Sequence, residues 1–110
     1  MKARSILITL PQVNNWPEIA AEVHYQAAQL AELWNVTPRT LQRQFRKELG
    51  TTPQKHLDAV RQTEAEKLIR EGARTKEIAA ELDYKQTSHF CRQFNNFHGM
   101  GARAWRMTAA

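Results

Sequence analysis

The sequence is poor in cysteine, glycine and proline, and it has no long apolar run. Its single cysteine, Cys91, cannot form an internal disulfide, which excludes a disulfide-stapled scaffold and fits a reducing cytoplasm. Four glycines and four prolines in 110 residues exclude collagen-like and low-complexity chains. Because no run of about eighteen residues is apolar, we expect no membrane-spanning helix. What remains is a globular domain with 42% hydrophobic and 25% charged residues.

The first ten residues do not resemble a targeting segment. Lys2 and Arg4 precede the apolar run Ile6–Ile8, which is too short for the core of a secretory signal peptide and lacks a small-residue cleavage site. We therefore expect a bacterial cytoplasmic protein. No segment other than the short stretch Ile6–Leu10 shows strand-like alternation.

The chain has a net charge of +5, and its positive charge is concentrated in two segments of the sequence. Residues 37–61 contain six basic and two acidic side chains, and residues 83–110 contain four basic and one acidic. The stretches 1–36 and 62–82 each have a net charge of −1. Two basic blocks between near-neutral ones indicate two anion-facing surfaces, for which nucleic acid is a candidate ligand.

Threonine, proline and glycine mark the ends of helices. Thr37-Pro38 and Thr52-Pro53 each combine a capping threonine with proline at the first helical position. Three glycines follow helical patterns and can end them in the left-handed conformation: Gly50, Gly72 and Gly99. With the apolar periodicity, these signals predict an all-α fold of seven helices, at residues 16–24, 27–34, 38–49, 53–71, 75–82, 87–98 and 102–107.

The chain contains an internal repeat. Arg43-Gln44-Phe45 recurs as Arg92-Gln93-Phe94 at a spacing of 49 residues, and Leu30-Ala31 recurs as Ile78-Ala79 at a spacing of 48. A glycine follows five residues after each phenylalanine of the tripeptide. Matching landmarks at one spacing are typical of a duplicated unit. The repeat predicts four parts: an N-terminal extension (1–15), a first unit (16–52), a linker helix (53–72) and a second unit (73–110).

Each copy has the pattern of a helix-turn-helix, in which a tight turn joins a short helix to a longer amphipathic one. Ala31 and Ala79 are small enough for two helices to cross closely. Four residues later come Asn35 and Asp83, at the turn, where positive φ is usually required and these residue types tolerate it. The next residue of each copy is expected to pack the turn onto the core: Val36 and Tyr84.

The longer helix of the first copy predicts a DNA-reading face. Leu41, Phe45 and Leu49 recur every four residues and form the expected buried stripe. Arginine can form two hydrogen bonds with guanine, and glutamine can do so with adenine. A solvated basic face is the alternative, but a glutamine among arginines beside a small-residue crossing favours DNA. Three arginines and one glutamine share a second face of this predicted helix: Arg39, Gln42, Arg43 and Arg46.

In the second copy the longer helix is less basic. Its expected buried stripe is Phe90, Phe94 and Phe97. Only one firm positive charge lies on its outward face, so the alternative is a stabilising copy that mostly contacts phosphates. The outward face consists of Ser88, Arg92 and Asn95, with His89 and Asn96 at its edge.

The helix predicted between the two copies can act as a spacer. At about 1.5 Å per residue it is roughly 27 Å long. Successive major-groove faces lie roughly 34 Å apart along a duplex. A rigid helix of that length could hold two reading helices about one turn apart, so that a monomer contacts two grooves.

These residues resemble the AraC/XylS family of bacterial transcription regulators. The likeness covers about residues 26–106. It implies seven helices, of which two enter adjacent major grooves of double-stranded DNA. We expect no cofactor. Small members of the family bind DNA as monomers, whereas larger ones carry a separate effector or dimerisation domain. The matching positions include Leu30-Ala31, Leu41-x-Arg43-x-Phe45, Gly50-Thr51-Thr52-Pro53, Arg61, Ala65, Glu77-Ile78-Ala79, Ser88 to Phe94 and Gly99.

The resemblance also implies roles for single residues; RNA polymerase is a candidate second partner, for which Trp34 could stay partly exposed. The base-reading positions are Arg39, Gln42 and Arg43 in the first unit and Thr87, Ser88, His89 and Arg92 in the second. We expect phosphate contacts from a further set: Thr37, Thr40, Arg46, Lys47, Lys55, Lys85, Asn95 and Asn96.

No other chemistry is indicated. His89, Cys91 and His98 could suggest zinc, but on one helix they are too far apart or point in different directions, so we predict no metal and a packed Cys91. No nucleophile–base–acid set or phosphate loop is present, so we expect no enzyme. Trp34 is expected either to cover the first helix or to stay partly exposed for a partner. The alternative function is a helical protein-interaction module with an incidental basic face.

Overall fold

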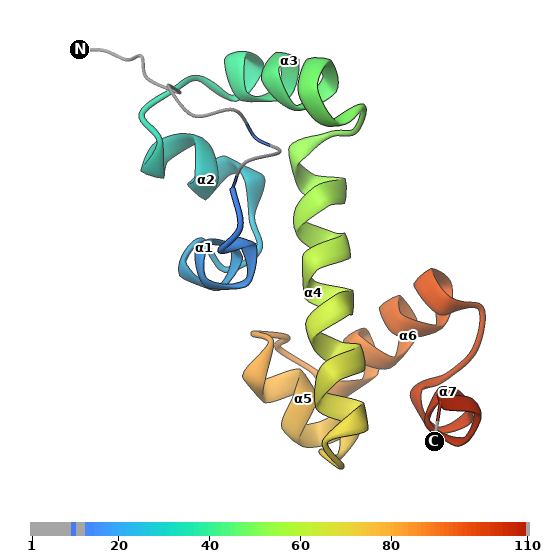
Figure 1. Cartoon of the computed structure of the whole chain (residues 1–110). Helices are drawn as coiled ribbons and strands as arrows, with labels where there is room; N and C mark the ends of the chain where they lie inside the picture. The colour runs from blue at the N-terminus through green and yellow to red at the C-terminus, as the bar shows by residue number, and fades with distance from the viewer. Residues whose placement is uncertain (1–9, 11–12, 110) are drawn as a thin grey trace. The chain divides into compact units, whose positions relative to one another are not determined.

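The computed structural model describes residue 10 and residues 13–109, and the regular structure in this part of the chain is helical. Figure 1 labels these helices along the chain. The all-α prediction with seven helices is therefore confirmed. The helices are α1 (Trp16–Glu22), α2 (Ala27–Leu33), α3 (Pro38–Leu49), α4 (Pro53–Arg70), α5 (Thr75–Glu81), α6 (Thr87–His98) and α7 (Ala102–Ala109).

Most helix ends agree with the signals in the sequence. The Thr37 hydroxyl accepts a hydrogen bond from the Thr40 backbone N–H at 3.1 Å, and the Thr52 hydroxyl does the same for Lys55 at 3.1 Å. Both are the predicted N-terminal caps. All three predicted glycine endings are confirmed, since their φ values are positive: Gly50 at 69°, Gly72 at 92° and Gly99 at 76°.

The predicted helix 16–24 is too long, because α1 ends at Glu22. His24 and Tyr25 have φ values of 55° and 58°, which no right-handed helix accommodates. Within the stretch Ile6–Leu10, residues 6–9 lie outside the described residues. Leu10 itself is 1% exposed, and its backbone N–H donates to the Glu48 carboxylate on α3 at 2.6 Å.

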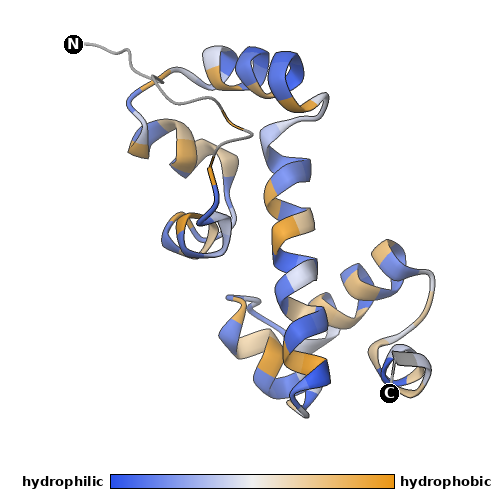
Figure 2. Cartoon of the chain, viewed as in Figure 1, coloured by the Kyte–Doolittle hydropathy of each residue, from blue (hydrophilic) through white to orange (hydrophobic). Residues whose placement is uncertain are grey.

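The described chain forms two compact units, divided between Val60 and Arg61. The first contains α1, α2, α3 and the beginning of α4. Hydrophobic residues lie on the inward-facing sides of these helices, as the hydropathy colouring in Figure 2 shows, and they form the core of this unit. Ala31, at the predicted close crossing, is 2% exposed. Larger side chains fill the rest of this core: Leu10, Val23, Tyr25, Leu30, Leu41, Phe45 and Leu57.

The second unit contains the remainder of α4 together with α5, α6 and α7. Ala79 and Tyr84 are buried as predicted, at 3% and 7% exposure. The prediction that Phe97 is buried is wrong, because 52% of it is exposed. His98 takes that place: its ring stacks on Phe94 with 3.8 Å between centroids, and its side chain is 8% exposed. The stripe thus continues by steps of four from Phe90 through Phe94 to His98.

Candidate nucleic-acid interface

The two turns have the same geometry. Asn35 and Asp83 have φ values of 56° and 69°, so the predicted positive φ is confirmed at both. The residue after each turn donates its backbone N–H to the alanine five positions earlier: Val36 to Ala31 at 3.0 Å and Tyr84 to Ala79 at 2.9 Å. Each unit therefore places a short helix and a long helix on either side of the same tight turn. These are two helix-turn-helix units.

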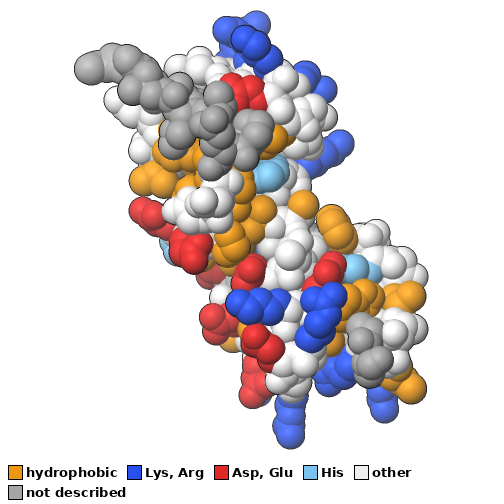
Figure 3. All heavy atoms as spheres, in the orientation of Figure 1, with side chains coloured by type: hydrophobic (Ala, Val, Ile, Leu, Met, Phe, Trp, Pro, Cys, Tyr) orange, Lys and Arg blue, Asp and Glu red, His pale blue; other side chains and the backbone are white. Residues whose placement is uncertain are grey.

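In the first unit, α3 presents its polar side to solvent. Leu41 and Phe45 are 1% and 0% exposed, while Leu49 at the helix end is half-buried. In Figure 3 basic side chains project from the surface over α3. All of the predicted reading and phosphate residues on and before this helix are exposed: Thr37, Arg39, Thr40, Gln42, Arg43, Arg46 and Lys47.

Among these residues, Thr37 and Thr40 are hydrogen-bonded to each other. The Thr37 hydroxyl donates to the Thr40 hydroxyl at 3.0 Å in addition to capping α3. By contrast, the side chains of Arg39, Arg43 and Arg46 have no hydrogen-bond or ion-pair partner within the described residues. Long, unpaired guanidinium groups on one helix face can turn to an external anion. Lys55 at the start of α4 is also exposed.

In the second unit, the outward face of α6 is polar but carries less charge. Thr87 is half-buried at the first helical position. The His89 ring packs edge-on against Tyr84 with centroids 5.3 Å apart, and the Ser88 hydroxyl lies 3.4 Å from the Gln86 side-chain oxygen. The remaining predicted contact residues of this unit are exposed: Lys85, Ser88, His89, Arg92, Asn95 and Asn96.

Cys91 was predicted to be packed, and this prediction is wrong. The thiol is exposed on α6. The packed stripe of α6 lies on Phe90 and Phe94, both 0% exposed, and the neighbouring position 91 falls about 100° away around the helix.

Around α3, an aromatic cluster fixes the helix against α1 and α4. Trp16 lies 5.9 Å from Phe45 and 4.4 Å from the His56 ring, measured between ring centroids. Trp34 lies 5.9 Å from Trp16, which favours its predicted packing role over a free surface role. Burial lowers the pKa of His56 below its usual 6.5, because the charged ring would lose its hydration. The His56 Nε2 atom is buried and has no hydrogen-bond partner among the described residues.

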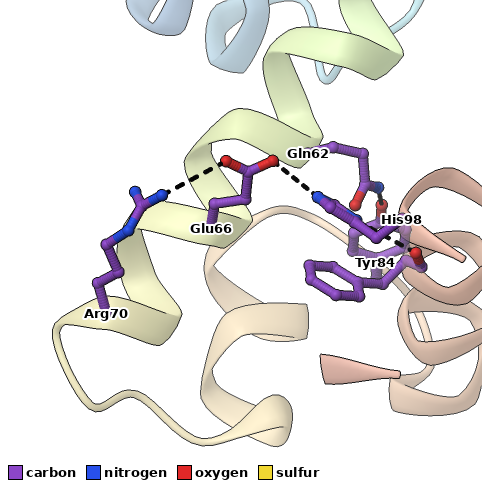
Figure 4. A network of polar contacts seen from close by, with 6 residues as sticks. Gln62, Glu66, Arg70, Tyr84 and His98 are labelled. Atoms are coloured by element: carbon purple, nitrogen blue, oxygen red, sulfur yellow. Dashed lines mark hydrogen bonds and ion pairs between the residues drawn. The ribbon is translucent and has the colours of Figure 1, made fainter. Parts of the chain in front are cut away.

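In the second unit, a buried polar network joins α4, the turn and the middle of α6, and Figure 4 shows its contact between Gln62 and Tyr84. Gln62 on α4 is 0% exposed, and its amide donates to the Tyr84 hydroxyl at 3.0 Å. Tyr84 donates in turn to the Gln93 side chain on α6. The Arg61 guanidinium group caps the C-terminal end of α5: two of its N–H groups donate to the Leu82 carbonyl, at 2.8 and 3.0 Å. This network fixes α6 relative to the turn.

A second set of polar contacts holds the other end of α6. His98 Nε2 lies 2.7 Å from a Glu66 carboxylate oxygen on α4, and His98 Nδ1 lies 3.2 Å from the Phe94 carbonyl (Figure 4). Glu66 also approaches Arg70 at 3.9 Å. The roles of Gln62, Glu66 and Gln93 were not predicted from the sequence. The repeat of Gln44 as Gln93 is the one signal that points to any of them.

Within the part of the chain that the structure describes, no three histidine, cysteine or acidic side chains are grouped so as to hold a metal ion. His98 faces Glu66, whereas Cys91 is exposed. No described helix is both long enough and apolar enough to cross a membrane.

Comparison with known proteins agrees with this geometry. A family model described as a helix-turn-helix domain matches residues 30–108. The HTH-type transcriptional activator RhaS of Escherichia coli strain E24377A is 35% identical over 81 residues, which cover 69% of this chain and 28% of that protein. RhaS of Salmonella arizonae is 34% identical over 93 residues, 78% of this chain and 33% of that protein. The chain thus spans about a third of the length of these relatives.

The fold has a counterpart of known structure. A DNA-binding transcriptional dual regulator from Escherichia coli K-12 superposes with a TM-score of 0.68 over 88% of this chain and 94% of that one, at 22% identity. The fold and its two exposed helix faces define a bipartite helix-turn-helix protein. With the family match over residues 30–108, the chain belongs to the AraC/XylS family and represents its DNA-binding domain.

Proposed function

We propose that this chain binds a specific sequence of double-stranded DNA, with α3 and α6 each placed in a major groove, and that it regulates transcription. One observation carries the proposal most directly. The same helix-turn-helix occurs twice, and in both copies the longer helix exposes polar side chains at equivalent positions, including Arg43 and Arg92.

On α3 the chemistry suits direct reading of bases. Arg39 and Arg43 can each donate two hydrogen bonds to the O6 and N7 atoms of guanine, and Gln42 can pair with the N6 and N7 atoms of adenine. On α6, Ser88, His89 and Arg92 supply fewer donors, and Thr87 is half-buried. We therefore assign the larger share of base discrimination to α3. The phosphate contacts proposed from sequence flank both helices and position them.

The two reading helices are proposed to contact adjacent grooves. Helix α4 is continuous from Pro53 to Arg70, which corresponds to about 27 Å at 1.5 Å per residue. From this length we infer that the two half-sites on the DNA lie about one duplex turn apart and that a single chain contacts both. The proposed linker (53–72) is this helix with its C-terminal turn.

The cellular setting follows from the same assignment. We propose a bacterial cytoplasmic protein associated with the nucleoid, with RNA polymerase as a second partner. No catalytic role is assigned. RhaS proteins are named transcriptional activators, and in this chain either activation or repression could follow from DNA binding.

The proposal is tested by measuring binding to duplex DNA as salt is raised. The preferred site is first selected from a random duplex pool, and a scrambled duplex serves as competitor. With about five to eight phosphate contacts, log K should fall with log salt at about −0.9 per contact. Arg46→Gln/Lys47→Gln should reduce that slope by about two, whereas Lys76→Gln on α5 should leave it unchanged.

A nearly flat salt dependence between about 50 and 200 mM, together with equal binding to the scrambled duplex, would reject DNA as the specific ligand. In that event the alternative of a helical protein-interaction module with an incidental basic face would take its place.

A further inference from the structure

Position 91 of α6 is the structural counterpart of position 42 of α3. The repeat spacing of 49 that aligns Arg43 with Arg92 also aligns Gln42 with Cys91. Each residue directly precedes the arginine, and each comes three residues before a phenylalanine that is 0% exposed. Both side chains are exposed. The two positions therefore lie at the same angle around their helices.

On α6 itself, Cys91 borders the proposed reading face. It lies three residues after Ser88 and four before Asn95, and side chains at these spacings are neighbours on a helix surface. Both neighbours are exposed as well. A groove that is contacted by Ser88 and Asn95 would therefore also be lined by Cys91.

The two side chains have different recognition chemistry. The glutamine amide carries a donor and an acceptor and matches the edge of adenine. A thiol is a small, largely apolar group and a weak donor, so it cannot make that pair of hydrogen bonds. Among the groups that line the major groove, the C5-methyl group of thymine is the one that apolar side chains contact.

We propose that Cys91 is a specificity-determining residue of the second unit, where it faces the major groove and contacts a thymine methyl group. This inference rests on the proposed function, because it requires α6 to enter a groove. It means that the two copies, although built alike, select different bases at the equivalent position: adenine through Gln42 and thymine through Cys91.

The first test uses the fact that Cys91 is the only cysteine. Its rate of reaction with the thiol reagent dithiobis(nitrobenzoate) is measured on the free chain, with the selected duplex and with the scrambled duplex. When about nine-tenths of the chain is bound to the selected duplex, the rate should fall roughly tenfold, because only the free tenth presents its thiol. A matched control is Cys91→Ser/Glu71→Cys, whose thiol lies in the exposed turn after α4 and should react at an unchanged rate.

DNA binding is followed in the same samples by gel retardation. The role of Cys91 and the proposed DNA binding can therefore be rejected independently of each other. A retarded complex in which Cys91 reacts as fast as in the free chain would overturn the role of Cys91 and leave DNA binding intact. Absence of any complex would overturn the proposed function and this inference with it.

The second test concerns the base itself. Cys91→Gln should shift the preference at one base pair of the second half-site from thymine towards adenine by about fivefold to a hundredfold, since one bidentate pair discriminates by about 1–3 kcal/mol. Cys91→Ala keeps a small apolar group and should retain the thymine preference. Selection profiles in which Cys91→Gln and Cys91→Ala both match the unaltered chain would contradict the proposal.

Discussion

Two arginines occupy equivalent positions on α3 and α6, but their neighbours differ. Arg43 stands beside Arg39, Gln42 and Arg46 on α3, whereas Arg92 on α6 is the only cation of its face. Arg43→Ala should therefore cost about 1–3 kcal/mol of binding free energy on the preferred site and relax the choice at one base pair. Arg92→Ala should cost less and change discrimination less.

The comparison between the two variants is fair, because each arginine lies two residues before a buried phenylalanine and is itself exposed. Neither substitution removes core packing. Binding of both variants is measured on the selected and the scrambled duplex. If Arg92→Ala proved the more damaging to discrimination, the ranking of the two units would be reversed.

At the scale of single residues, the backbone conformation of the turns could be predicted from the sequence. The exposure of side chains next to a buried helix stripe could not. Asn35 and Asp83 could be assigned positive φ because few other residue types tolerate it. Phe97 and Cys91 were placed inside because both are apolar types near a buried stripe. The helical period leaves two candidates for the end of such a stripe, at steps of three and four, and His98 takes that position through its stacking on Phe94 and its contact with Glu66.

The packing of α3 against α1 and α4 has a pH-dependent component. Burial lowers the pKa of His56, so the folded unit keeps this ring neutral at a pH where the unfolded chain protonates it. The free energy of unfolding of the first unit should therefore fall as the pH drops below 6.5, until the lower pKa of the folded state is passed. At higher pH the ring is neutral in both states and this contribution is constant.

The effect is isolated by comparing the chain with its His56→Phe variant, which keeps an aromatic ring against Trp16 but cannot titrate. Unfolding by urea is followed by tryptophan fluorescence in a Trp105→Phe background, so that Trp16 and Trp34 report the first unit. Between pH 7.5 and 5.5 the unaltered chain should lose more stability than His56→Phe. Parallel stability curves for the two chains would contradict this account, because they would show that the pKa of His56 is the same in the folded and the unfolded chain.

At the scale of elements, helix bounds could be predicted to within about two residues, because threonine caps and glycine endings act locally. The side-chain contacts that hold these helices against one another could not be predicted from the sequence. The Gln62–Tyr84–Gln93 network joins three segments that are distant in sequence, and Arg61 reaches the end of α5 across 21 residues. Side chains that are polar by type become structural only when the fold brings their partners together.

For the whole molecule, the duplication was visible in the sequence as a shared tripeptide, and the structure contains the same turn twice. A duplicated helix-turn-helix within one chain predicts two half-sites in one operator. The proposed spacing of those half-sites rests on the length of α4, which is a single helix from Pro53 to Arg70. The central claim is that both units of one chain read one duplex at once.

The most direct test of that claim is the affinity for duplexes in which five base pairs are inserted between the selected half-sites. Such an insertion rotates one half-site by about half a turn, to the opposite face of the duplex. Because a continuous helix cannot follow that rotation, affinity should fall to the level of a duplex with one half-site scrambled. Affinity that is unchanged by the insertion, while scrambling either half-site still weakens binding, would contradict the account.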